Sequence, residues 1–183
     1  MNEGSWWMVF TVVCLLSLVG LLEYEGKINL IGESESDSKP GESESDSKPL
    51  TSTSDEMHPL GESCLNGHDG MAMHFHPYLT IVIDGDEYPI AQNTGIDTGT
   101  CPDAMHMTHT HDASGKLHVE SHTVEEVPLE VFFDVWGVHF DNTGIFDLRD
   151  GTIEMKVNGQ ESADYQNLIL EDGQNIVITY TSN

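Results

Sequence analysis

The sequence predicts an α+β domain in which a small mixed β-sheet carries one helix. Two apolar segments rich in β-branched residues, Tyr78–Ile83 and Asn175–Tyr180, have the composition of buried strands. Between them, Pro128–Trp136 is the one segment whose apolar residues recur at helical spacing. A single apolar helical stripe between strands indicates a helix that packs against the sheet. The stripe consists of Leu129, Phe132, Phe133 and Trp136.

The elements before the helix follow from turn residues and alternation. Asp84-Gly85-Asp86 is a hairpin turn signal after the first strand. We expect Glu87–Ala91 to return beside that strand at the sheet edge, because Pro89 has no N–H to donate. Gln92–Asp103 is rich in turn residues and is predicted as loop, as is Met105–Asp112. Leu117–Ser121 is predicted as the next strand.

The helix and the elements after it complete the predicted order. Pro128 suits the first helical position and Gly137 suits the end. Thr152–Val157 is predicted as a strand, and Asn158-Gly159 as the turn that follows. The resulting order, ββ-loop-β-α-ββ, looks like a β-grasp (ubiquitin-like) arrangement. A cupredoxin-like β-sandwich is the alternative, and neither topology implies a function.

The N-terminal residues 1–31 contain a long uncharged segment, Trp6–Leu22. As a helix this segment would extend about 25 Å, slightly less than the roughly 30 Å of a bilayer core. A signal peptide is the alternative, but the basic start and the small-residue cleavage site typical of signal peptides are missing here. We therefore expect a single-pass membrane anchor, with the rest of the chain at the cell membrane outside the cytoplasm.

A perfect tandem repeat of GESESDSKP separates the anchor from the predicted domain. The two copies occupy Gly32–Pro40 and Gly41–Pro49. Such a polar sequence cannot bury enough apolar area to offset its ordering entropy, so residues 32–56 are predicted as a disordered linker. Coil scaling gives this linker a reach of about 25–30 Å. Residues 57–183 then form the globular domain.

The chain is strongly acidic. Thirty-two acidic residues against 6 basic residues give a formal net charge of -26. Nucleic acids and anionic membrane surfaces repel such a protein, so neither is an expected partner. An acidic surface keeps the protein soluble, and its field also draws cations toward it.

Ten histidines are distributed so that several share one side of an extended chain. Side chains two residues apart point the same way in a strand, which pairs His74 with His76 and His109 with His111. His118 and Glu120 form a third such pair. Converging imidazoles predict a transition-metal site. The predicted ligands are His74, His76, His109 and His111, while His118, Glu120 and Asp112 are predicted as alternates or as groups that orient the imidazoles.

The predicted metal is copper or zinc. Several imidazoles suit either ion, and the interleaved thioethers of Met71, Met73, Met105 and Met107 favour copper unless they only fill packing gaps. Because the ligating imidazoles must be neutral, binding should weaken below about pH 6. Two other interpretations stay open: the histidines are solvated or structural, or they sense pH.

Cys64 and Cys101 precede the two histidine clusters, one each. In an oxidising compartment, two such cysteines most often form a disulfide. A disulfide here would bring the segment of His74 and His76 close to that of His109 and His111.

Several blocks resemble an uncharacterised family of exported or membrane-anchored prokaryotic proteins with histidine-rich domains. The blocks are HFHPYLTIVIDG, HTHDASGKLHVES, PLEVFFDVWG, VNGQ and DGQNIVI, in this order. The resemblance implies one domain but no activity. The expected function is a membrane-tethered extracytoplasmic module for copper or zinc handling. The alternatives are a metal-dependent enzyme with Glu120 or Asp112 as base, and a structural or adhesive surface domain with incidental histidines.

Overall fold

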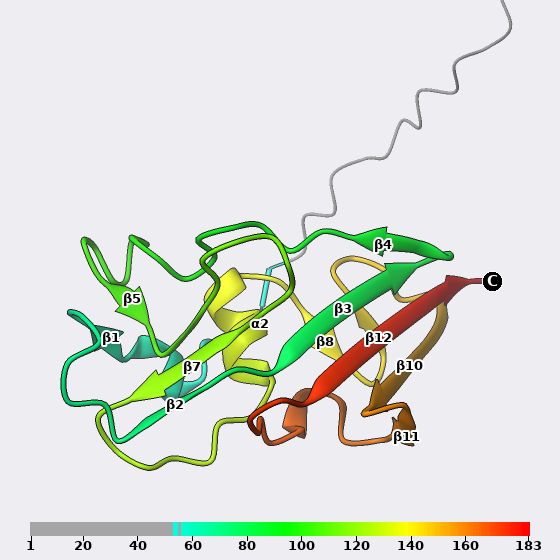
Figure 1. Cartoon of the computed structure of the whole chain (residues 1–183). Helices are drawn as coiled ribbons and strands as arrows, with labels where there is room; N and C mark the ends of the chain where they lie inside the picture. Colours follow the sequence, from blue (N-terminus) through cyan, green and yellow to red (C-terminus); the bar gives the residue numbers. More distant parts are fainter. Residues whose placement is uncertain (1–52, 55) are drawn as a thin grey trace, which may run out of the picture. The chain divides into compact units, whose positions relative to one another are not determined.

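The computed structural model describes residues 53–54 and 56–183 (Figure 1). The predicted anchor and all of the predicted linker except residues 53–54 and 56 lie outside them. Among the described residues, no helix is both long enough and apolar enough to cross a membrane. The described part is mostly β, with one short α-helix and several small sheets.

The helical segments are η1 (Pro59–Glu62), α2 (Glu130–Trp136) and η2 (Tyr165–Asn167). The strands are β1 (Cys64–Leu65), β2 (Met73–Phe75), β3 (Tyr78–Ile83), β4 (Asp86–Tyr88), β5 (Met105–His106), β6 (Thr108–His109), β7 (His118–Ser121), β8 (Phe140–Asp141), β9 (Gly144–Ile145), β10 (Gly151–Val157), β11 (Gln160–Ser162) and β12 (Asn175–Ser182).

The largest sheet has the strand order β11-β10-β12-β3-β4. Strands β12 and β3 are parallel, whereas the other neighbours are antiparallel, so the sheet is mixed as predicted. Figure 1 shows β12, in red, between β3 and β10. Strand β3 has the predicted bounds. Strand β4 lies at the predicted edge but ends at Tyr88, because Pro89 cannot continue the ladder.

Both predicted hairpin turns are present. Asp84 and Gly85 have φ of 53° and 93°, and Asn158 and Gly159 have φ of 52° and 79°. Two-residue hairpin loops of this kind need positive φ at both central positions, which Asn, Asp and Gly tolerate best. These turns fix which faces of β3, β4, β10 and β11 meet the core.

The predicted helix forms, but its predicted start at Pro128 is wrong. Helix α2 begins at Glu130, because Pro128 pairs with Ile169 in an isolated bridge and the Leu129 N–H donates to the Leu168 carbonyl (2.8 Å). These contacts tie Pro128 and Leu129 to the segment of Leu168 and Ile169, although Leu129 already has helical φ and ψ (-57° and -29°). The predicted end at Gly137 is confirmed by its left-handed conformation (φ 76°).

The core joins the large sheet to α2. Leu79 and Ile81 of β3 and Ile176 and Ile178 of β12 are each at most 2% exposed. Phe132 of α2 is fully buried in the same cluster, which also contains Phe133 and Leu129. The predicted apolar stripe therefore packs as core.

A second sheet has the order β2-β7-β6. The prediction that Met105–Asp112 is loop was wrong, because β5 and β6 fall within it. This segment finds partners in the preceding turn-rich region: the His106 N–H donates to the Gly95 carbonyl (2.8 Å), and the Thr110 N–H to the Thr94 carbonyl (3.0 Å).

The predicted disulfide between Cys64 and Cys101 is confirmed, with a Cα–Cα distance of 5.5 Å. Next to it, β1 pairs with β5, with Cys64 opposite His106. The disulfide and this pairing attach the loop after β1 to the segment that leads into β6. They hold the beginning of the domain against the second sheet.

Candidate metal centre

Four polar side chains come together on one face of the second sheet. In β7, Val119 turns into the core and is fully buried, so His118 and Glu120 share the opposite face. Across the two ladders, His74 of β2 pairs with Glu120, and His109 of β6 pairs with His118. The strand register therefore places three imidazoles and one carboxylate on the same face of the sheet.

The second histidine of each H-x-H pair extends this cluster. The Nε2 atoms of His74 and His76 are 3.0 Å apart, and those of His109 and His111 are 3.3 Å apart. The rings of His76 and His111 each lie 4.5 Å from the ring of His118, measured between centroids. His118 is thus the centre on which both pairs converge.

Two groups of histidines could hold a metal ion. They are His74, His76 and His118, and His109, His111 and His118; within each, the ligand atoms lie within 4.8 Å of one another. The four histidines that the sequence named as ligands are all present, divided between the groups. His118, predicted as an alternate, belongs to both. Which of these side chains ligate stays a prediction.

Glu120 is fully buried beneath the imidazoles. Its Oε2 accepts a hydrogen bond from His68 Nδ1 (2.7 Å), and its Oε1 lies 3.2 Å from His74 Nε2 and 3.5 Å from His118 Nδ1. Burial raises the pKa of Glu120, but the hydrogen bond from His68 and the neighbouring histidine charges outweigh it and lower the pKa. Oε1 and His118 Nδ1 have no hydrogen bond of acceptable geometry. A buried carboxylate of this kind orients metal-binding imidazoles.

His68 is a member of the cluster that the sequence prediction missed. Its ring lies 6.1 Å from the ring of His74 and 6.1 Å from that of His111. It comes from the irregular segment after β1, where no strand alternation exists to reveal it. The available signal was its position shortly after Cys64, because the disulfide carries this segment to the cluster.

His109 is held in one tautomer. Its Nδ1–H donates to the His106 carbonyl (3.0 Å), which leaves Nε2 as the acceptor nitrogen in the hydrogen bond with His111 Nε2 (3.3 Å). Desolvation by burial lowers the pKa of His109 to about 4. Desolvation, together with the charges of the nearby histidines, also lowers the pKa of His118 to about 4. Both imidazoles are therefore neutral near pH 7, as ligation requires.

His76 is half-buried in the cluster. Burial, the charge of Lys116 and the charge of His74 lower its pKa, while Asp172 and Glu120 oppose the shift. The Asp172 carboxylate accepts the backbone N–H of His76 (2.9 Å), which fixes the chain just beyond β2.

Asp112, His122 and two of the methionines lie outside the two groups. Asp112 accepts the Ser114 N–H (2.9 Å) within a turn. His122 Nδ1 donates to the Gly70 carbonyl (3.3 Å). Among the methionines, Met107 is 1% exposed in the core and the Met73 sulfur accepts the Glu125 N–H (3.2 Å). Packing and a backbone contact account for these two thioethers, so they give no support to copper.

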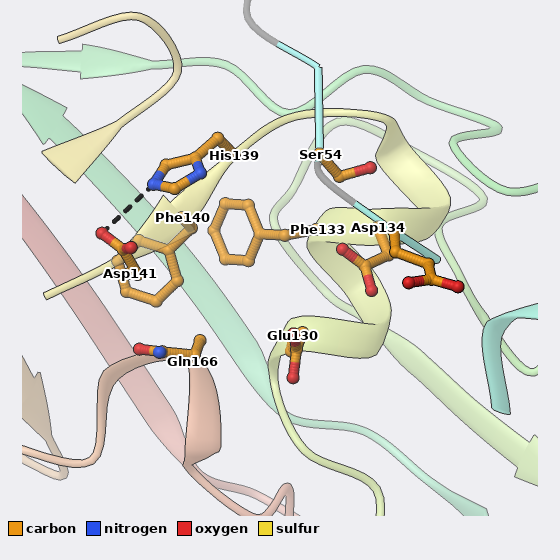
Figure 2. Close-up of a pocket in the computed structure, with 9 residues that line it drawn as sticks. Ser54, Glu130, Phe133, Asp134, His139, Phe140, Asp141 and Gln166 are labelled. Carbon is orange, nitrogen blue, oxygen red and sulfur yellow. Dashed lines mark ion pairs between the residues drawn. The ribbon is translucent and has the colours of Figure 1, made fainter. Parts of the chain in front are cut away.

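A separate polar cavity of about 110 Å³ lies beside α2 (Figure 2). His139 Nε2 and Asp141 Oδ1 pair at 3.1 Å on one side, and Glu130 and Asp134 of α2 line another side. Its lining does not include the clustered histidines. It is therefore a different surface from the candidate metal centre.

No family model, curated protein or solved structure matches this chain.

Proposed function

We propose that this chain is a membrane-tethered extracytoplasmic domain that binds a divalent transition-metal ion, copper or zinc, and serves in handling that metal. The observation that carries the proposal is the convergence of two H-x-H pairs on His118. Two nitrogens bound to one ion at about 2.0–2.1 Å are separated by about 2.8–3.4 Å when the ligand angle is between about 90° and 110°. The Nε2 separations of 3.0 and 3.3 Å fall in this range.

The electrostatics of the site support cation binding. Neutral imidazoles at His109 and His118 and an ionised carboxylate at Glu120 form a donor set that gains by accepting a positive ion. The net charge of -26 raises the local concentration of cations around the domain.

The donor types support Cu(II) and Zn(II) as the ions. Imidazole nitrogens with a carboxylate oxygen suit both, and Cu(II) binds such sites more tightly in the general order of divalent ions. A preference for Cu(I) would need thioether ligands, and two of the four candidate thioethers are used elsewhere.

The proposed location rests on the sequence and on the disulfide. The apolar segment Trp6–Leu22 and the linker suit a tether. The disulfide between Cys64 and Cys101 is typical of an oxidising compartment outside the cytoplasm. The block pattern supports membership in the family of exported histidine-rich proteins that it resembles.

We also propose that the large sheet is a β-grasp. Its two central strands, β3 and β12, are parallel, and β4 and β10 flank them. Helix α2 lies between the two hairpins in the sequence. This order supports a β-grasp rather than a cupredoxin-like sandwich, with β2, β6 and β7 as an added sheet that carries the histidines.

The test is metal content and affinity of the purified full-length protein. We expect stoichiometric Cu(II) or Zn(II) by elemental analysis and tight binding by titration calorimetry. The double substitution His109→Ala/His111→Ala should weaken binding, whereas His122→Ala, which removes a histidine outside the cluster, should not. Binding of neither ion above the background of a histidine-free control protein would refute the proposal.

A further inference from the structure

We propose that the histidine cluster is a two-ion centre, with one ion on each H-x-H pair and His118 between them. This inference rests on the proposed metal binding. It adds that the domain carries two ions at once and that only one of the two positions has a fully buried histidine.

The separation of the two pairs argues against a single ion. Two ligands of one ion with bonds of about 2.1 Å cannot lie more than about 4.2 Å apart. Among the described residues, each pair forms a group with His118 within 4.8 Å, but the two pairs do not join into one group. A single ion could therefore take one pair and His118, and it would leave the other pair empty.

Each pair has enough donors for its own ion. His109 and His111 have His118 as a third ligand. His74 and His76 also have His118 in their group, and the Glu120 Oε1 atom, which has no hydrogen bond, lies 3.2 Å from His74 Nε2. His68 lies beside both pairs, with its ring 6.1 Å from the rings of His74 and His111. With His118 on the pair of His109 and His111, and Glu120 completing the pair of His74 and His76, each ion would have three protein ligands and one open tetrahedral position.

The charge of Glu120 makes two neighbouring dications possible. Two positive ions a few ångströms apart repel strongly unless anionic ligands lie between or beside them. Glu120 is fully buried at the base of the cluster and contacts histidines from β2 and β7 and from the segment after β1. The negative charge of its carboxylate would therefore reduce the repulsion between the two ions.

The two positions are not equivalent. The His109 side chain is fully buried, and the His106 carbonyl fixes its tautomer. The His74 side chain is 43% exposed, and His111, the partner of His109, is exposed as well, so the difference between the pairs lies in His109. A pre-oriented buried ligand loses less freedom on binding than an exposed one. The pair that contains His109 therefore fills first, and the pair that contains His74 receives the second, more readily exchanged ion.

Native mass spectrometry of the full-length protein with Zn(II) alone, and then with Cu(II) alone, tests this inference. We expect two ions per chain at saturation. His74→Ala/His76→Ala should leave one tightly bound ion, and His109→Ala/His111→Ala should leave one weakly bound ion. The control His122→Ala should keep two.

A second readout does not depend on substitutions. With two equivalents of Cu(II), the two spins should couple, and the integrated paramagnetic resonance signal should fall below twice that of the singly loaded protein. One ion in the unsubstituted protein, lost in both pair variants, would overturn the two-ion centre and leave the metal-binding proposal intact. Two ions retained in either pair variant would also overturn it. Absence of any bound ion would instead refute the metal-binding proposal.

Discussion

His109 lies directly opposite His118 across β6 and β7, and the two rings stack with centroids 5.2 Å apart and planes 18° apart. Two protonated imidazoles at this distance repel each other, and burial opposes the charge on each. The fold therefore excludes the second proton from each ring until the pH approaches 4, where the pKa values of both rings lie. The same exclusion keeps the two rings neutral and ready to bind a cation.

The first prediction concerns pH and the metal-free protein. A histidine in the unfolded chain has a pKa of about 6.5, whereas the pKa of His109 in the folded protein is about 4. The unfolded chain therefore takes up protons first as the pH falls. The full stability is present above about pH 6.5 and is lost progressively down to about pH 4, by on the order of 2–3 kcal/mol for His109.

Urea unfolding in the presence of a chelator, at about pH 7 and about pH 4.5, measures this loss. The variant His109→Gln should show a smaller difference between the two pH values than the unsubstituted protein. An equal pH dependence of the two proteins would contradict the assignment to His109.

The second prediction concerns Glu120. The substitution Glu120→Gln keeps the shape of the side chain but removes the charge that orients His68 and His74. We expect metal affinity to fall by about 10- to 100-fold, as for other groups that support metal ligands. Competition titration with a chromophoric chelator measures the change. The matched control is Glu126→Gln, at an exposed position. An equal loss of affinity in both variants would show that the net charge of the domain, and not the position of Glu120 beside the histidines, is responsible.

Alternation and turn chemistry were enough to predict much of the fold. The bounds of β3, the edge position of β4 and the end of α2 at Gly137 depend on local patterns, and all three were predicted correctly. The disulfide followed from cysteine number and expected compartment. The start of α2 could not be predicted, because it depends on the bridge between Pro128 and Ile169, which are distant in sequence.

In the candidate site, too, some residues could be found from local sequence patterns, whereas others depend on contacts between segments distant in the sequence. The H-x-H pairs are visible in the sequence because residues two apart share a face of a strand. The shared position of His118 depends on the register between β6 and β7, which places it opposite His109. His68 reaches the cluster through a disulfide-linked irregular segment, so no local periodicity marks it.

The third prediction concerns the disulfide, whose cysteines are 37 residues apart in the sequence. The double variant Cys64→Ser/Cys101→Ser should lose about 2–4 kcal/mol of unfolding free energy, because its unfolded chain is no longer constrained by a closed loop. Metal affinity should also fall, since the segment that carries His68 is less firmly held. Chemical denaturation and calorimetry measure the two effects.

Treating the unsubstituted protein with a reductant should reproduce both losses, and the same reductant should leave the double variant unchanged. A stable, fully metal-competent double variant would show that the pairing of β1 with β5 holds the segment without the disulfide.

The fourth prediction concerns Gly115, in the turn before β7. Its φ is +78°, and a Cβ at this position would collide with the backbone carbonyl oxygen of Leu79. We expect Gly115→Ala to lower the unfolding free energy by at least about 2 kcal/mol, from backbone strain and displacement of β3 from this turn. Gly85→Ala is the matched control, because Gly85 also has positive φ (+93°) but has no atom within 4 Å of the added Cβ.

Thermal unfolding of the two variants at one pH compares them directly. The control should be destabilised by only about 1 kcal/mol, the strain of a left-handed alanine. Similar losses of unfolding free energy in both variants would rule out the close approach to Leu79 as the cause.

The central position of β12 has a consequence for biosynthesis. Asp84, at the end of β3, binds Ser182 at the end of β12 although the two are 98 residues apart in the sequence. When both H-x-H pairs have emerged from the ribosome, the nascent chain still lacks β12, the strand that joins β3 to β10 in the sheet. Pairing over such a distance is slow to form. A chain truncated before Asn175, by a nonsense mutation or by proteolysis, would therefore stay unfolded and expose its histidines. It would not form a smaller domain that binds metal.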